Sequence, residues 1–164
     1  MPFGGNDWLA LNQEPTIEPD LPICDPHHHF WDLRPQRIPY QRYLLHELAA
    51  DITSGHNIVS TVFIEARSMY RADGPEELKP VGEVEFVQGL AAASESGLYG
   101  PGRAATAIVG HANLNLGDKV EPVLEALLAA SPNRFRGIRH SVTWDPNPEI
   151  ENTAAHNWQG QLST

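Results

Sequence analysis

The stretch Ile23-Cys-Asp-Pro-His-His-His-Phe-Trp-Asp32 leads from apolar residues into a cluster of three histidines. On a β-strand successive side chains point to opposite faces, so Asp25, His27 and His29 would share one face. His28 would then lie on the other face. Neutral imidazole is the commonest metal ligand in proteins, and two imidazoles separated by one strand residue can reach one ion. The stretch therefore predicts a strand that carries a pair of metal ligands.

Apolar, β-branched runs and helical stripes alternate along the chain. The runs predict four strands, at residues 21–28, 58–66, 104–112 and 135–140. The stripes predict three helices, at residues 44–52, 76–96 and 118–130, the second with an irregular first turn caused by Pro80 and Gly82. Strand and helix patterns that alternate in this way are typical of a parallel α/β fold.

This order of elements resembles the start of a (β/α)8 TIM barrel. We expect residues 1–20 to form a flexible leader, and residues 21–164 to form the N-terminal half of the barrel, with about four parallel strands and outer helices. The domain would be truncated after the fourth strand, because a full barrel needs roughly 250 residues. Open sheet edges would then favour instability or association into a homo-oligomer.

The motif Asp25-Pro-His-His-His-Phe-Trp-Asp32, followed by Thr61-Val-Phe-Ile-Glu-Ala66, resembles the amidohydrolase-related family. These proteins are metal-dependent hydrolases with a TIM-barrel fold, and the lactonase-like branch is the most similar. The resemblance extends from about Pro22 to Trp144. It implies that His27 and His29 bind a divalent metal ion, with zinc as the first choice.

Three functions follow from the resemblance and from the length of the chain. The first is hydrolysis of a lactone or similar cyclic ester, such as a carboxylated lactone, through a metal-activated water. The second is non-oxidative decarboxylation, which the same family also carries out. The third is an inactive fragment that binds metal weakly, because catalytic zinc sites usually have three protein ligands. The family's further ligands, a histidine and an aspartate, would lie beyond Thr164.

Polar residues at the ends of the later strands are candidates for catalysis. Arg139 presents a planar fork that suits a substrate carboxylate. His140 and His111 are either further ligands and proton carriers, or histidines hydrogen-bonded in the barrel rim. Glu65 is either a site residue that supports a metal-bound imidazole, or the ion-pair partner of Arg67.

The long segment after the first strand contains further polar candidates. Two prolines disfavour a helix there, and loops at the carboxyl ends of barrel strands form the active site. These side chains either reach the substrate or are solvated on the surface: Arg34, Arg37, Tyr40 and Arg42.

Composition excludes several classes of partner. The formal net charge is −10 and the sequence pI is about 5.1, so the chain is not expected to bind nucleic acid or an anionic membrane. No signal peptide or membrane span is evident, and we expect a cytoplasmic protein with a small-molecule substrate. Cys24 is the single cysteine, which excludes an internal disulfide, and we expect it to be buried in the first strand.

Overall fold

The structure, a computed structural model, describes residues 10–12, 14–33, 40–142, 147 and 149. Four strands form one sheet in the order β1-β2-β3-β4, and each neighbouring pair is parallel. The strands are β1 (Ile23–His28), β2 (Ile58–Ile64), β3 (Arg103–Gly110) and β4 (Phe135–Ile138). The predicted α/β architecture is confirmed, and four parallel strands flanked by helices are compatible with half of a (β/α)8 barrel.

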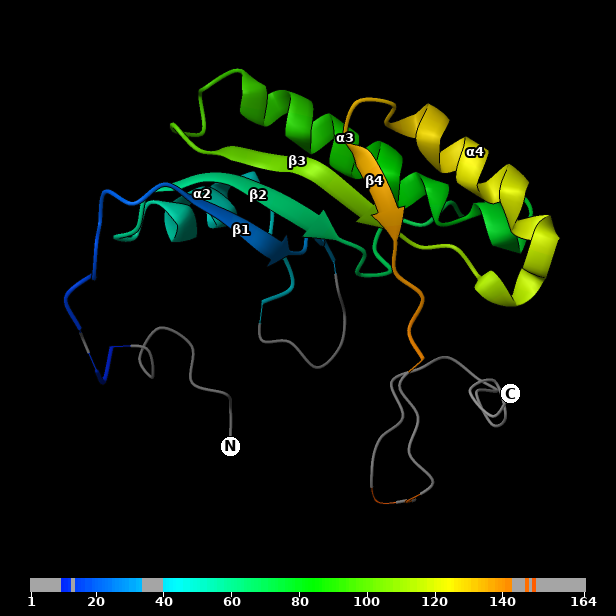
Figure 1. Cartoon of the computed structure of the whole chain (residues 1–164), viewed down its shortest axis with the longest axis horizontal. Helices are drawn as coiled ribbons and strands as arrows, with labels where there is room; N and C mark the ends of the chain where they lie inside the picture. Colours follow the sequence, from blue (N-terminus) through cyan, green and yellow to red (C-terminus); the bar gives the residue numbers. More distant parts are fainter. Residues whose placement is uncertain (1–9, 13, 34–39, 143–146, 148, 150–164) are drawn as a thin grey trace.

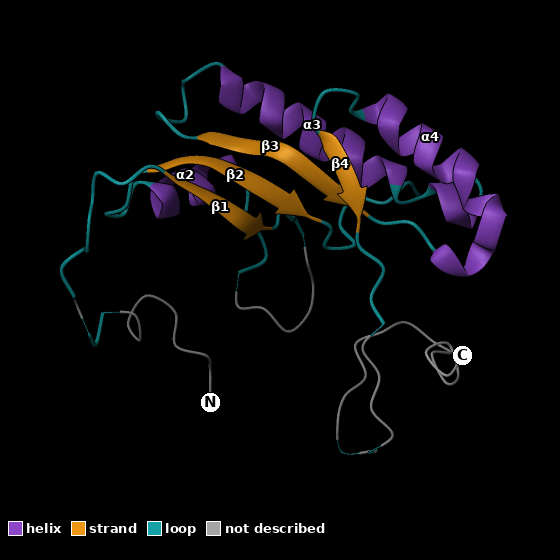
Figure 2. Cartoon of the chain, in the orientation of Figure 1, coloured by secondary structure: helices purple, strands orange, loops and turns teal. Residues whose placement is uncertain are grey.

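Helices connect the strands, and α3 and α4 lie over the same face of the sheet (Figures 1 and 2). The helices are α2 (Leu45–Ile52), α3 (Val81–Glu95) and α4 (Glu121–Ala130), and the 3₁₀ turns are η1 (Glu76–Leu78) and η2 (Leu114–Val120). The irregular start predicted for the second helix is confirmed, because η1 precedes α3 and Pro80 is its N-cap. The third helix begins later than predicted because residues 118–120 belong to the 3₁₀ turn η2, in which Gly117 has non-helical angles, φ 56° and ψ −134°.

The hydrophobic core lies between the sheet and these helices. Val84, Val87 and Ala91 of α3 are fully buried, as the helical stripe predicts. At the carboxyl end of β3, a Cβ on Gly110 would lie 3.0 Å from Val84 and 3.2 Å from Phe135. The absence of a side chain at residue 110 therefore lets α3 pack directly on the end of the central strand.

Cys24, which was expected to be buried, is exposed. Leu21, which the predicted strand included, precedes β1 and has 53% of its surface exposed. The prediction of a buried cysteine is wrong because β1 is an edge strand of this sheet, so only β2 pairs with it among the described strands. Leu128 of α4 is 50% exposed, and the buried residues of that helix are Val123 and Leu127.

All four strands run in the same direction, so their carboxyl ends meet at one edge of the sheet (Figure 2). The strand predicted over residues 58–66 ends at Ile64. The backbone nitrogen of Glu65 still donates to the carbonyl of Val109, at 2.8 Å, but Arg67 has a left-handed φ of 56° and turns the chain away. This edge therefore carries the polar residues that follow each strand.

Only part of the predicted leader, residues 1–20, is described by the structure. Residues 1–9 and 13 of the predicted leader lie outside the described residues. Within the described part, none of the helices combines the length and the apolar character that crossing a membrane requires.

Two glycines of α3 provide a matched test of how this helix is seated. A Cβ on Gly82 would lie 2.6 Å from the carbonyl oxygen of Met69, whereas a Cβ on Gly89 meets no atom within 4 Å. We expect Gly82→Ala to lower the free energy of unfolding by about 1–3 kcal/mol through overpacking. Gly89→Ala should raise it by up to about 1 kcal/mol, because alanine is the better helix former. Urea denaturation measures both, and equal effects would contradict the described packing.

Candidate functional site

The histidines at the end of β1 alternate between the two faces of the sheet. The rings of His27 and His29 meet edge to face with centroids 4.9 Å apart. His28 is buried and contacts the rings of Phe30 and Phe63, at 4.7 and 5.9 Å. Burial lowers the pKa of His28 to about 4, so this ring is neutral at pH 7 and packs as part of the core. The shared face predicted for His27 and His29 is therefore present.

A neighbouring strand fixes the orientation of His29. Its Nδ1 lies 2.7 Å from the carbonyl oxygen of Ile64, the last residue of β2. A carbonyl only accepts, so Nδ1 carries the proton and Nε2 keeps its lone pair. Burial is the main cause that lowers the pKa of His29, which favours the neutral ring. His29 therefore presents Nε2 in the form that binds a metal ion.

His27 and His29 fit a metal ion as two of its ligands. Both are imidazoles on one face, and the hydrogen bond to Ile64 is of the kind that metal-binding histidines make through their second nitrogen. Among the residues that the structure describes, no group of three or more His, Cys, Asp or Glu side chains is placed to hold a metal. The described residues thus provide a pair of ligands, and a divalent ion remains a prediction.

Glu65 and Arg139 form an ion pair at the ends of β2 and β4. The Arg139 Nε lies 2.9 Å from Glu65 Oε1, and Nη2 donates to the backbone carbonyl of Glu65. Glu65 therefore forms an ion pair, as one alternative predicted, but the predicted partner, Arg67, is wrong. The Glu65 side chain is 7% exposed, and within the described part of the chain its Oε2 has no hydrogen-bond partner. One buried carboxylate oxygen of Glu65 therefore has no hydrogen-bond partner among the described residues, and Glu65 interacts electrostatically with His29.

His111 and His140 follow β3 and β4, and their rings lie 5.6 Å apart. Nδ1 of His111 lies 3.0 Å from the carbonyl oxygen of Arg139, so it donates and Nε2 keeps the lone pair. Nδ1 of His140 lies 2.9 Å from the backbone nitrogen of Leu114 and 3.0 Å from the carbonyl oxygen of Ala112. Both rings are thus hydrogen-bonded to backbone groups at the carboxyl ends of the strands, as expected if these histidines have a structural role. A catalytic role for His140 stays a prediction.

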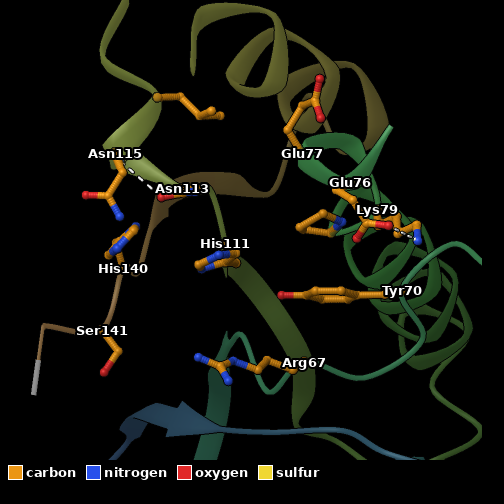
Figure 3. Close-up of a pocket in the computed structure, with 12 residues that line it drawn as sticks. Arg67, Tyr70, Glu76, Glu77, Lys79, His111, Asn113, Asn115, His140 and Ser141 are labelled. Atoms are coloured by element: carbon orange, nitrogen blue, oxygen red, sulfur yellow. Dashed lines mark hydrogen bonds and ion pairs between the residues drawn. The ribbon is translucent and has the colours of Figure 1, made fainter. Parts of the chain in front are cut away.

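A cavity of about 490 Å³ lies between the loops that follow β2, β3 and β4 (Figure 3). Most of the residues that line it have polar or charged side chains, and the lining comprises Arg67, Tyr70, Glu76, Glu77, Lys79, Pro80, His111, Asn113, Asn115, Leu116, His140 and Ser141. No pattern in the sequence pointed to Tyr70 or Lys79, because both lie in an irregular connection rather than at a strand end. Their position in the loop after β2 was the one available signal.

A buried carboxylate of α3 holds the loop after β2. Glu83 is fully buried, and its Oε1 accepts hydrogen bonds from the backbone nitrogens of Ala66 and Ser68, at 2.9 and 2.8 Å. The hydroxyl of Ser68 donates to the carbonyl of Phe30 at 2.7 Å and so links this loop to the end of β1. Glu83 was missed in the sequence because acidic residues in the first turn of a helix usually face solvent.

The structure describes two of the four predicted candidates after β1. Arg34 and Arg37 fall outside the described residues. Tyr40 is 47% exposed, and Arg42 lies 3.6 Å from Glu47 in an exposed ion pair. The solvated alternative therefore describes Tyr40 and Arg42 better than contact with a substrate.

Comparisons with protein-family models, with curated proteins and with solved structures found no match for this chain.

Glu83 gives stability a dependence on pH that can be measured. Burial raises its pKa from 4.5 to about 7, so the folded state binds a proton more tightly than the unfolded state does. This contribution is full below about pH 4.5 and is lost as the pH rises through 7. Glu83→Gln keeps an accepting oxygen but does not titrate. We therefore expect the free energy of unfolding of this variant, relative to that of the wild type, to rise by about 3 kcal/mol between pH 4.5 and 8.

Urea denaturation across this pH range measures the effect, with Glu85→Gln as the matched control on the exposed side of the same helix. A constant difference between Glu83→Gln and the wild type at all pH values would show that Glu83 does not titrate in the folded protein.

Proposed function

We propose that this chain carries the first-strand metal ligands of a metal-dependent hydrolase, and that its substrate is a lactone or a similar cyclic ester. The observation that supports the proposal best is the His27 and His29 pair, on one face of β1, with Nδ1 of His29 bonded to Ile64. A divalent ion bound there, zinc by first choice, would supply a Lewis acid and a water of lowered pKa. The remaining chemistry belongs to the residues around it.

His27 and His29 would hold the ion through ring nitrogens. The carbonyl of Ile64 keeps His29 in one tautomer and one orientation, so the ligand atom needs no rearrangement on binding. His28 faces the core instead, where Phe30 and Phe63 contact its ring.

Glu65 would accept the proton of the attacking water, and Arg139 would hold Glu65 in position. Oε2 of Glu65 is buried and has no partner in the described part of the chain, so it can accept a proton from an attacking water. Arg139 holds the other oxygen and the backbone carbonyl of the same residue, which fixes the direction of the carboxylate. Arg139 acts in this account as a positioning residue for Glu65.

The number of ligands bears on turnover. Catalytic zinc sites normally use three protein ligands, and the described residues offer two imidazoles. We therefore expect the 164-residue chain to bind zinc weakly and to hydrolyse lactones slowly or not at all. Metal-dependent turnover of a lactone panel that is lost in His27→Ala would show instead that the chain completes a catalytic site.

Zinc titration of point variants tests the proposal without turnover. We expect His27→Ala and His29→Ala each to weaken zinc binding by more than the 10–100-fold that loss of an outer hydrogen-bond partner costs. His28→Phe, which keeps a ring at the buried position, should bind zinc like the wild type. The exposed His46→Ala serves as a second control. Similar losses in all four variants, or a wild type that binds no zinc, would contradict the proposal.

A further inference from the structure

The cavity between the loops after β2, β3 and β4 is not used by the chemistry above. Neither His27 nor His29 lines it, and neither Glu65 nor Arg139 does. With about 490 Å³ it is large enough for a small organic molecule. Arg67, Tyr70 and His111 meet in its lower part (Figure 3).

The backbone of Arg67 is fixed in an unusual conformation. Its φ of 56° is left-handed, which few residues other than glycine adopt without cost. The backbone nitrogens on both sides of it, those of Ala66 and Ser68, donate to the same oxygen of the buried Glu83. Strained conformations persist where the surroundings determine them, and they cluster at functional sites. The start of the loop therefore presents Arg67 in a fixed position.

The rest of the loop is equally constrained. The backbone nitrogen of Arg71 donates to the carbonyl of Lys79 at 3.0 Å. Gly82 packs so closely on this loop that an added Cβ would lie 2.6 Å from Met69 and 2.9 Å from Arg71. Tyr70 lies between these two contacts. The loop is therefore preorganised before any ligand binds, which reduces the entropy cost of binding.

The polar groups of Arg67 and Tyr70 are unused within the described residues. No hydrogen bond or ion pair joins the Arg67 guanidinium to another described side chain, whereas Lys79 nearby is paired with Glu76. The Tyr70 hydroxyl is buried, has no hydrogen-bond partner in the same part of the chain, and points toward His111. Burial raises the pKa of Tyr70, so this hydroxyl stays protonated and can donate.

The geometry points to a carboxylate-binding site: we propose that Arg67 and Tyr70 hold the carboxylate of a small organic acid in this cavity. A guanidinium offers two parallel N–H groups to a carboxylate, and the phenol adds a third donor. Glu77 also lines the cavity, but it is drawn away from Arg67 and Tyr70. Arg139 is less suited to this role because Glu65 already occupies two of its nitrogens.

The ligand class follows from the proposed function. If the substrate is a cyclic ester, the ligand is a lactone that carries a carboxylate, with its ring on the side of His111. Nε2 of His111 keeps its lone pair, because Nδ1 donates to Arg139, so it can accept a hydrogen bond from the ligand. This assignment rests on the proposed function, whereas carboxylate binding by Arg67 does not.

Binding measured in the presence of EDTA tests the site apart from metal chemistry. The probes are γ-butyrolactone-γ-carboxylate, uncharged γ-butyrolactone and inorganic phosphate, titrated into the full chain and followed by NMR chemical shifts. We expect saturable binding of the carboxylated lactone alone. Arg67→Gln should weaken it about tenfold or more, as expected for loss of a charged hydrogen-bond partner. Arg67→Lys should bind with intermediate affinity because it lacks the planar fork.

Tyr70→Phe separates a binding role from a structural one. If the hydroxyl binds a ligand, its removal should weaken ligand binding several-fold. The Tm of the free protein should stay unchanged or rise, because the substitution removes a buried polar group that has no hydrogen-bond partner among the described residues. A lower Tm would show that the hydroxyl has a structural partner. Arg134→Gln is the matched control for Arg67→Gln, since Arg134 precedes β4 at the opposite edge of the sheet and pairs with Glu95.

Three results would overturn the carboxylate site. They are no binding of the carboxylated lactone by the wild type, equal binding of the uncharged lactone or phosphate, and equal affinity in Arg67→Gln and Arg134→Gln. If the chain binds the carboxylated lactone through Arg67 but does not bind zinc, the proposed hydrolase function is contradicted and the carboxylate site stands. If the chain binds zinc but lactone binding does not depend on Arg67, the carboxylate site is contradicted and the proposed function stands.

Discussion

Parallel pairing of the four strands in chain order is the constraint on which the rest of this structure depends. Each strand must be followed by a crossover that returns to the same starting edge, so every carboxyl end falls at one edge of the sheet. The histidine pair at the end of β1, Glu65 after β2, His111 after β3 and Arg139 after β4 all lie at this edge for this reason. The hydrogen bond from His29 to the last carbonyl of β2 is a direct product of that pairing.

The second requirement is a rigid support for the loops at that edge, and α3 supplies it. The carboxyl group of Glu83 is buried, which is costly for its charged form, and hydrogen bonds from two backbone nitrogens offset part of the cost. The same two bonds set the path of the chain from Glu65 to Tyr70. Ser68 also bonds to the carbonyl of Phe30, so the loop after β2 and the histidine segment are held as one unit.

The sequence predicted what depends on local periodicity. The four strands, the irregular start of α3 and the shared face of His27 and His29 follow from alternation and from prolines. It could not predict the partner of Glu65, because Arg139 lies 74 residues further along the chain and beyond an intervening strand. A register shift between Ile108 and Val109 in the β3–β4 pairing also changes which β4 residues oppose the end of β3. Cys24 was misplaced because the exposure of an edge strand depends on which strands pair, not on its composition.

The central claim is that β2 prepares His29 as a metal ligand before any ion binds. Long-range ¹H–¹⁵N NMR of the imidazole rings, recorded on the metal-free chain near pH 7, tests this directly because it distinguishes the two tautomers. We expect His29 to carry its proton on Nδ1, and addition of zinc to shift Nε2 of His29 together with one ring nitrogen of His27. A metal-free His29 protonated on Nε2, or zinc-induced shifts confined to other histidines, would contradict the account.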